Sequence, residues 1–209
     1  SPESCGLFYP LNGQDSKFDQ LNAFMQSKNR ILDIYVTETS WFPGSDEGTT
    51  EFTADFTEKL QADYLVRSYI YHMHEGVKMY NWYSLLDWDQ DKSGLFRRDG
   101  SVEGVFGTPR PSYATHANMT RQLYGMTMQE LYTNETQQVY GARLTDTSKD
   151  IHMIWADGVS KWVTFNGVAG MTIIDVMGNP VVPISVGGGQ YKVKVADSPV
   201  YIKSTGLNS

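Results

Sequence analysis

The stretch ILDIYVTETSW at residues 31–41 decides the fold that the sequence predicts. It begins with an apolar, β-branched run, reaches the carboxylate of Glu38 and is followed closely by the indole of Trp41. Such runs are typical of buried parallel strands, because both faces of the strand are covered and strict alternation is not required. Since active sites of parallel folds form at the carboxyl ends of strands, Glu38 is a candidate catalytic residue. The alternative is a glutamate that only caps the strand end or pairs with a charge there.

A second stretch of this kind, GVKMYNWYSLLDW, occupies residues 76–88 and also runs into aromatic residues. The segment between the two stretches has apolar residues at helical spacing, which predicts a helix over about 54–74. The sequence therefore predicts two parallel strands, 31–37 and 77–83, joined by a helical crossover. Two further helices are expected, from about 17 to 29 and from Pro111 to about Leu123.

With these residues the chain resembles the last third of a retaining glycoside hydrolase barrel, in the superfamily that carries both catalytic glutamates on strand ends. In that superfamily the seventh strand ends in Thr-Glu, with the Glu as nucleophile, and the eighth ends in a tryptophan that floors the sugar site. Thr37-Glu38 and Trp82 match those places. The family's ending is also matched by the Gly94-Leu95-Phe96 turn, by Asp99-Gly100 and by the start of the last helix at Arg110-Pro111-Ser112-Tyr113-Ala114.

The resemblance implies the C-terminal portion of a (β/α)8 TIM barrel over residues 1–130. From about residue 137 the pattern changes to period two, with short strands separated by Asp-Gly, Asn-Gly and Gly-Gly-Gly turns. This spacing predicts a small antiparallel β-sandwich over 137–203, an accessory domain that supplies no catalytic group in the family. The fold class is thus α/β plus all-β. We expect the sandwich to fold without the barrel part, because it has its own strands and turns. We also expect apolar contact between the two parts, so that they do not tumble independently.

Retaining glycoside hydrolysis needs two carboxylates about 5–5.5 Å apart, one attacking the anomeric carbon and the other protonating the leaving oxygen. The resemblance implies that Glu38 is the nucleophile and that Trp82 is the sugar platform. Trp41 and Tyr9 are further candidates for lining the cleft, and each of these rings can instead be core packing. The family's acid/base Glu follows an Asn on the fourth strand. The Asn-Glu pair at 134–135 lies between the predicted domains and is rejected for that role.

The predicted function is therefore a retaining glycoside hydrolase acting on a β-linked glycoside or polysaccharide, with this chain supplying the nucleophile half of the site. A missing N-terminal barrel part is expected from the same gene, from a cleaved chain or from another protomer, and the chain alone is expected to be inactive. The alternatives are a non-catalytic carbohydrate-binding or structural protein derived from a glycosidase fold, and a hydrolase of another class. An extracellular or secreted location is expected.

Composition and charge exclude several other classes of protein. The formal net charge of −7 and the absence of a Lys/Arg cluster argue against a nucleic-acid surface, and no apolar run is long enough to span a membrane. The acidic run DWDQDKSG at 87–94 resembles a calcium loop, but Lys92 and Arg98 stand where that loop needs Gly and Glu. His72 and His74 face different ways on a helix. No metal and no cofactor are expected.

Overall fold

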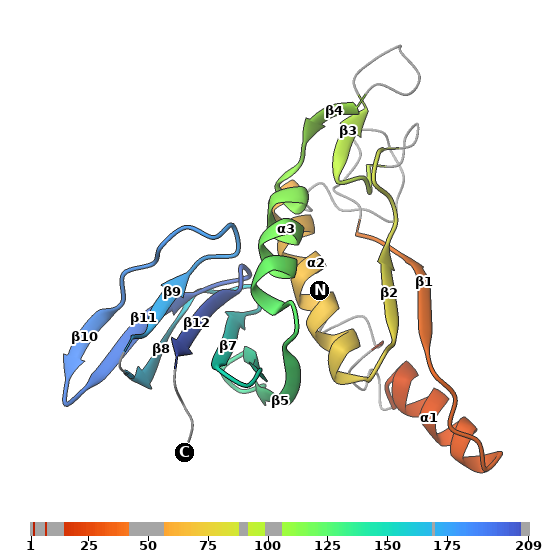
Figure 1. The fold of residues 1–209 in the computed structure, drawn as a ribbon, viewed down its shortest axis with the longest axis horizontal. Helices are drawn as coiled ribbons and strands as arrows, with labels where there is room; N and C mark the ends of the chain where they lie inside the picture. Colours follow the sequence, from red (N-terminus) through yellow and green to blue (C-terminus); the bar gives the residue numbers. More distant parts are fainter. Residues whose placement is uncertain are drawn as a thin grey trace.

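The computed structural model describes residues 2, 7, 15–41, 57–87, 92–98, 106–168 and 170–205. It contains helices and antiparallel sheets together with one parallel strand pair (Figure 1). In chain order the elements are α1 (Lys17–Ser27), β1 (Tyr35–Thr39), α2 (Glu58–His74), β2 (Met79–Trp82), β3 (Phe96–Arg98), β4 (Phe106–Pro109), α3 (Pro111–Leu123), β5 (Thr127–Asn134), β6 (Val139–Thr145), β7 (Lys149–Ala156), β8 (Lys161–Asn166), β9 (Thr172–Ile174), β10 (Ile184–Gly187), β11 (Gln190–Val195) and β12 (Val200–Thr205).

The first part of the chain, residues 15–123, is called here the helix–strand region. Its β1 and β2 strands pair in parallel, with Tyr35 opposite Met79 and Thr39 opposite Trp82, as the crossover pattern predicts. The strand predicted over 31–37 is shifted, because residues 31–34 are not part of it and it continues to Thr39. The apolar side chains that suggested an earlier start are largely exposed, so their hydrophobicity does not mark a buried strand in this chain.

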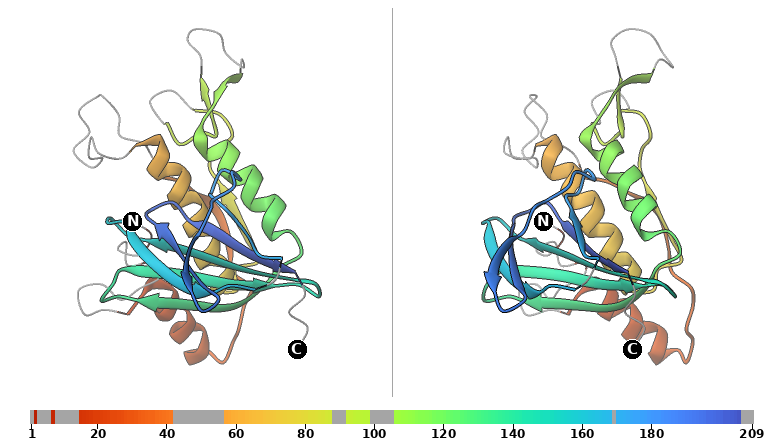
Figure 2. Two further views of the ribbon diagram at one scale, coloured as in Figure 1. Left: turned by 90° about the vertical axis from the view of Figure 1, so that its left-hand side faces the viewer. Right: turned by 60° about the vertical axis from the view of Figure 1, so that its left-hand side comes forward.

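Helix α2 is the centre of the helix–strand region. It begins after the N-cap Thr57, whose hydroxyl accepts a hydrogen bond from the backbone N–H of Leu60 at 3.3 Å. The helix is buried almost all round because α3 packs beside it, the β1–β2 pair lies on one side and a sheet lies on the other (Figures 1 and 2). Pro111 occupies the first turn of α3, as predicted.

The remainder, residues 124–205, is called here the two-sheet region. A five-stranded antiparallel sheet has the order β5-β6-β7-β12-β9, and a three-stranded antiparallel sheet has the order β10-β11-β8. Strand β5 was not predicted, because its sequence TMQELYTN does not alternate cleanly between apolar and polar residues. It pairs with β6 along its whole length, so the five-stranded sheet begins at Thr127 and not at residue 137.

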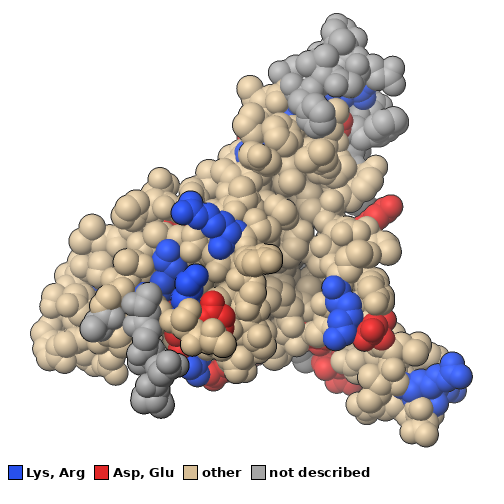
Figure 3. Space-filling model, viewed as in Figure 1, with Lys and Arg blue, Asp and Glu red and all other residues tan. Residues whose placement is uncertain are grey.

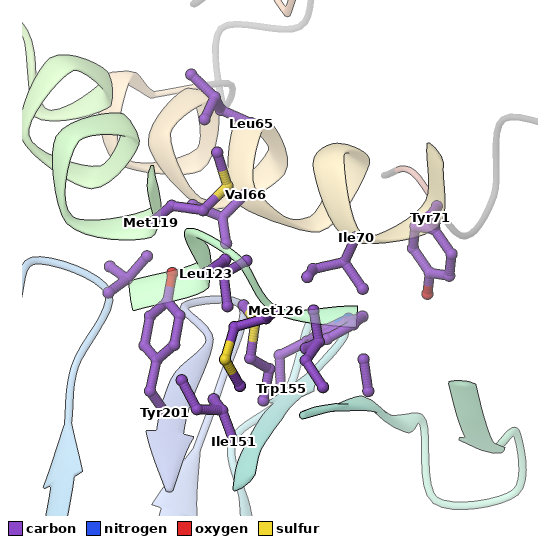
Figure 4. Close-up of a cluster of buried hydrophobic side chains, with 14 of the residues drawn as sticks. Leu65, Val66, Ile70, Tyr71, Met119, Leu123, Met126, Ile151, Trp155 and Tyr201 are labelled. Carbon is purple, nitrogen blue, oxygen red and sulfur yellow. The ribbon is translucent and has the colours of Figure 1, made fainter. Parts of the chain in front are cut away.

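Two apolar clusters cover the two faces of the five-stranded sheet. One cluster lies between this sheet and the helices, where Val66 and Ile70 of α2 point toward the sheet that carries Trp155 and Tyr201 (Figure 4). The rings of Tyr71 and Trp155 meet edge to face, with centroids 5.9 Å apart. The other cluster lies between the two sheets and includes Val193. The helices and the sheet therefore share a core, and separate folding of the two-sheet region stays a prediction.

Polar contacts also join the two regions. The guanidinium of Arg67 on α2 is fully buried and pairs with Asp157 at 2.8 Å and with Asp197 at 3.5 Å. The amide of Asn118 on α3 donates to the carbonyl of Val176 at 3.1 Å. These bonds fix the angle at which the helices lie on the sheet. None of the helices that the structure describes is long and apolar enough to cross a membrane.

Candidate functional site

Glu38 and Trp82 lie at the same end of two adjacent strands. Glu38 precedes Thr39, which is the register partner of Trp82, and the backbone N–H of Tyr83 donates to the carbonyl of Thr39 at 2.8 Å. The side chain of Glu38 is exposed, whereas Trp82 is half-buried. The structure therefore places both residues near the carboxyl ends of β1 and β2, with Trp82 opposite Thr39 and packed against the apolar core and Glu38 exposed.

The register of the strand pair shifts next to Glu38. From Val36 to Thr39 strand β1 advances three residues, while β2 advances only two, from Tyr80 to Trp82. The extra residue of this irregularity falls within Thr37-Glu38. Bulges of this kind bend a strand and re-aim its side chains, and they are common beside active sites. The sequence gives no signal for the bulge, because it depends on pairing between distant residues.

The segment that follows β2 holds the indole of Trp82 from one side. Its Nε1–H donates to the carbonyl of Ser93 at 2.9 Å. The segment returns on itself, since Leu95 N donates to the carbonyl of Ser84 at 3.1 Å and Asp87 N donates to the carbonyl of Phe96 at 3.0 Å. Trp82 is thus fixed in orientation by a turn that lies directly after its own strand.

A buried charge network secures this turn. Asp87 accepts hydrogen bonds from the backbone N–H of Gly94 at 2.9 Å and from the guanidinium of Arg110, and Arg110 also pairs with Glu58 at the start of α2. A Cβ on Gly94 would lie 2.3 Å from the backbone nitrogen of Asp87, so only glycine fits there. Glu58 also binds Arg97, which links the β3–β4 hairpin to α2. The local sequence patterns did not predict the roles of Glu58 and Arg110 in this network, because the two residues are far apart in the sequence.

Trp41 lies against α2. Its Nε1–H donates to the hydroxyl of Ser68 at 2.9 Å, and its ring meets Tyr64 edge to face at 5.1 Å. These contacts are those of a packing residue, and the predicted role of Trp41 in lining a cleft stays a prediction. Tyr9, the other predicted lining residue, is outside the part of the chain that the structure describes.

Neutral rings pack between β2 and α2. The ring of His72 lies 4.0 Å from that of Tyr80, and its Nδ1 is 2.7 Å from the carbonyl oxygen of Ser68. Burial lowers the pKa of His72 to about 4, so the imidazole is neutral near pH 7. Burial also raises the pKa of Tyr69 to about 12. Among the described residues, no group of three or more His, Cys, Asp or Glu side chains is arranged to hold a metal ion.

The outward side of the β1–β2 pair carries apolar side chains in contact with water. Tyr35 of β1 is 56% exposed and Met79 of β2 is exposed as well; in the segments next to the strands, Ile31, Tyr83 and Leu85 are also exposed. Few charged atoms appear over β1 and β2 in Figure 3. Parallel strands are usually covered on both faces. An exposed apolar surface of this kind is typical of an interaction site.

Comparisons with known proteins identify the fold. No protein-family model and no curated protein sequence matches this chain. A family 39 glycoside hydrolase from the gut symbiont Bacteroides cellulosilyticus WH2 aligns with a TM-score of 0.69 and 19% identity, over 97% of this chain and 42% of that one. A family 30 subfamily 8 xylanase from Clostridium acetobutylicum aligns with a TM-score of 0.55 and 14% identity, over 88% and 45% of the two chains.

A conserved exported protein from Bacteroides fragilis aligns with a TM-score of 0.57 and 12% identity, over 90% of this chain and 42% of that one. This chain therefore spans less than half the length of each of these structures. The arrangement of helices and sheets is that of part of a glycoside hydrolase, which agrees with the fold that the sequence resemblance implies at this coarse level.

Proposed function

We propose that this chain forms the nucleophile half of a retaining glycoside hydrolase that acts on a β-linked glycoside or polysaccharide. Glu38 is the nucleophile and Trp82 is the floor of the sugar site. In this proposal the helix–strand region is the end of a (β/α)8 barrel and the two-sheet region is its β-sandwich. The observation that supports the proposal is the register of β1 and β2, which pairs Thr39 with Trp82 at the carboxyl ends of the strands, directly after the strand irregularity at Thr37-Glu38.

The chemistry follows from this placement. The carboxylate of Glu38 attacks the anomeric carbon, the bond to the leaving oxygen breaks, and a covalent glycosyl-enzyme forms. A second carboxyl group protonates the leaving oxygen and later takes a proton from the attacking water. The indole of Trp82 offers a flat apolar face to the sugar ring, and its bond to Ser93 keeps that face in one orientation.

The second carboxyl group is proposed to come from a partner polypeptide, the N-terminal part of the barrel. The exposed ring of Tyr35 on β1 and the exposed Ile31 in the segment before it give this polypeptide a surface to cover. A strand added beside β1 would extend the parallel sheet and bring its own carboxyl end next to Glu38. We further propose that the complete enzyme works outside the cell on a carbohydrate substrate.

The test is covalent labelling of the native protein, isolated with any polypeptide that accompanies it. A cyclophellitol-type probe should modify the peptide that contains Glu38, because only a live nucleophile opens the probe. Glu38→Gln, introduced in the gene, should abolish labelling and lower turnover by several orders of magnitude. Glu130→Gln is the matched control, since Glu130 is an exposed strand carboxylate in the other region and should change neither result.

Two outcomes would overturn the assignment. Labelling at a carboxylate other than Glu38 would identify a different nucleophile. Glycoside binding without labelling or turnover, unchanged by Glu38→Gln, would favour the non-catalytic carbohydrate-binding protein instead.

A further inference from the structure

The outer face of the three-stranded sheet has a composition unlike that of the rest of the molecule. Along β8 the side chains of Val163 and Phe165 face the apolar cluster between the sheets, so Trp162, Thr164 and Asn166 face outward. Their register partners on β11, in the same order, are Lys194, Lys192 and Gln190. These six side chains therefore form one flat row across two strands, called here the outer Trp–Lys face. It lies far from β1 and β2, at the opposite side of the molecule in Figure 1.

Trp162 lies at one end of the outer Trp–Lys face, opposite Lys194. It is 53% exposed, which is unusual for the largest side chain, and nothing in its strand requires an aromatic residue there. The ammonium of Lys192 lies 5.0 Å from the centroid of its ring. Beyond Lys192, the side-chain amide of Gln190 donates to that of Asn166 at 3.2 Å. The face thus presents an aromatic plane, two ammonium groups and an amide pair in succession.

The charge of the outer Trp–Lys face is opposite to that of the whole chain. The formal net charge of the chain is −7, yet the sequences KWVTFN, ISVG and QYKVKV of β8, β10 and β11 contain lysines and no Asp or Glu. A local positive face attracts anionic ligands even when the protein as a whole is acidic. It also repels other copies of this negatively charged chain less than the remaining surface does. The charge therefore indicates an anionic ligand.

We propose that the outer Trp–Lys face binds an acidic polysaccharide, one that contains uronate residues. The indole of Trp162 would lie against the apolar C–H face of one sugar ring, and Lys192 and Lys194 would pair with carboxylates of neighbouring sugars. The amides of Asn166 and Gln190 would hydrogen-bond to hydroxyl groups. A uronate polysaccharide is favoured over an acidic peptide, because it offers both carboxylates for the lysines and a C–H sugar face for the ring of Trp162. This binding does not depend on Glu38.

Calorimetric titration of the full chain with a defined oligogalacturonate tests the proposal. Its fully methyl-esterified form is the matched ligand, since it has the same sugar backbone without the charges. We expect binding of the free acid that weakens as salt rises, and binding of the ester at least about fivefold weaker. Trp162→Ala should weaken binding of both ligands about fivefold or more, whereas Trp162→Phe should retain most of it.

The lysines make a separate contribution that can be distinguished. The double variant Lys192→Ala/Lys194→Ala should remove the preference for the free acid over the ester while leaving the weaker binding of the ester in place. Tyr124→Ala and Lys149→Ala are controls, because Tyr124 and Lys149 are an exposed aromatic and an exposed lysine of other elements. Neither control should change either affinity by more than about twofold.

Several results would overturn the proposal. These are the absence of binding at millimolar oligogalacturonate, unchanged affinity in a folded Trp162→Ala variant, and equal binding of poly-glutamate. The last result would mean that the face recognises charge alone or an acidic peptide. Glu38→Gln should leave oligogalacturonate binding unchanged, so the outcome is independent of the glycosidase assignment.

Discussion

The five-stranded sheet and the β1–β2 pair are built in the same chain but are covered very differently. The five-stranded sheet has an apolar cluster on each face, one shared with α2 and α3 and the other with the three-stranded sheet. The β1–β2 pair is covered by α2 on one side, where Tyr80 packs on His72. On its other side Tyr35 and Met79 are exposed.

The apolar packing that stabilises the chain and the candidate catalytic residues therefore lie in different parts of the molecule. Burial of apolar surface contributes most of the free energy of folding, so the stability of this chain is concentrated between α2 and the five-stranded sheet. Glu38 and Trp82 stand on the half-covered pair instead. Substitutions in the two places should therefore have very different effects on the free energy of unfolding.

The largest effect is expected from Trp155→Ala. Trp155 is fully buried between Tyr71 and Tyr140, and its removal should lower the free energy of unfolding by about 3–5 kcal/mol. Tyr35→Ser on β1 is the comparison, and its exposed ring should change that free energy by less than about 0.5 kcal/mol. Urea denaturation of both variants measures the difference. Similar losses for the two would mean that β1 is covered in solution by part of the same chain.

The second largest effect is expected in the charge network of Asp87, Arg110 and Glu58, which secures the turn that binds Trp82. Arg110→Ala leaves the buried carboxylate of Asp87 without its guanidinium partner and should lower the free energy of unfolding by about 3 kcal/mol. Arg97→Ala is a matched control, because Arg97 also binds Glu58 but is partly exposed, and it should cost about 1 kcal/mol or less. The Trp82 environment, followed by fluorescence, should change only in the Arg110 variant. An unchanged spectrum would show that the turn holds Trp82 without the network.

The third effect depends on pH and on two histidines, one in each region. The folded-state pKa of His72 is about 4 and the unfolded value is 6.5, so its contribution to stability is complete above pH 6.5 and is lost as the pH falls toward 4. Between pH 7 and pH 4.5 this loss should be about 2–3 kcal/mol, and His72→Asn should remove it. His152→Asn should remove less, because His152 is partly exposed although burial lowers its pKa too. The midpoints of urea denaturation at pH 7 and pH 4.5 provide the measurement. An equal loss of stability between these pH values in wild type and His72→Asn would contradict the prediction.

The local patterns of the sequence predicted those elements whose signals lie within a few residues. Pro111 marked the start of α3, and the alternation of KWVTFN marked β8. The parallel pairing of β1 with β2 followed from their crossover spacing. Strand β5 was missed because its pairing with β6, not its own pattern, makes it a strand.

The candidate site was predictable only in part, for a related reason. Glu38 and Trp82 could be placed at strand ends from their position after apolar runs. The pairing of Trp41 with Ser68 and of Arg110 with Asp87 joins residues far apart in the sequence, and such contacts leave no periodic signal. Apolar contact between the two parts was expected, but its residues could not be read, since the apolar residues of β7 would look the same facing a helix or a second sheet.

The smallest effect on stability is expected from Ile31→Ser, and it bears most directly on why β1 is half-covered. Ile31 is 90% exposed, so the change should alter the free energy of unfolding by less than about 0.5 kcal/mol. If the proposed partner polypeptide covers β1, however, Ile31 becomes buried in the complex, and its loss should weaken association by about 1.5–3 kcal/mol, roughly ten- to a hundredfold. Sedimentation of the native assembly, compared with Val182→Ser as an equally exposed control on the two-sheet region, measures this. If the variant unfolds more easily but associates normally, Ile31 is part of the core of this chain. The exposed surface on which the partner proposal rests would then not exist.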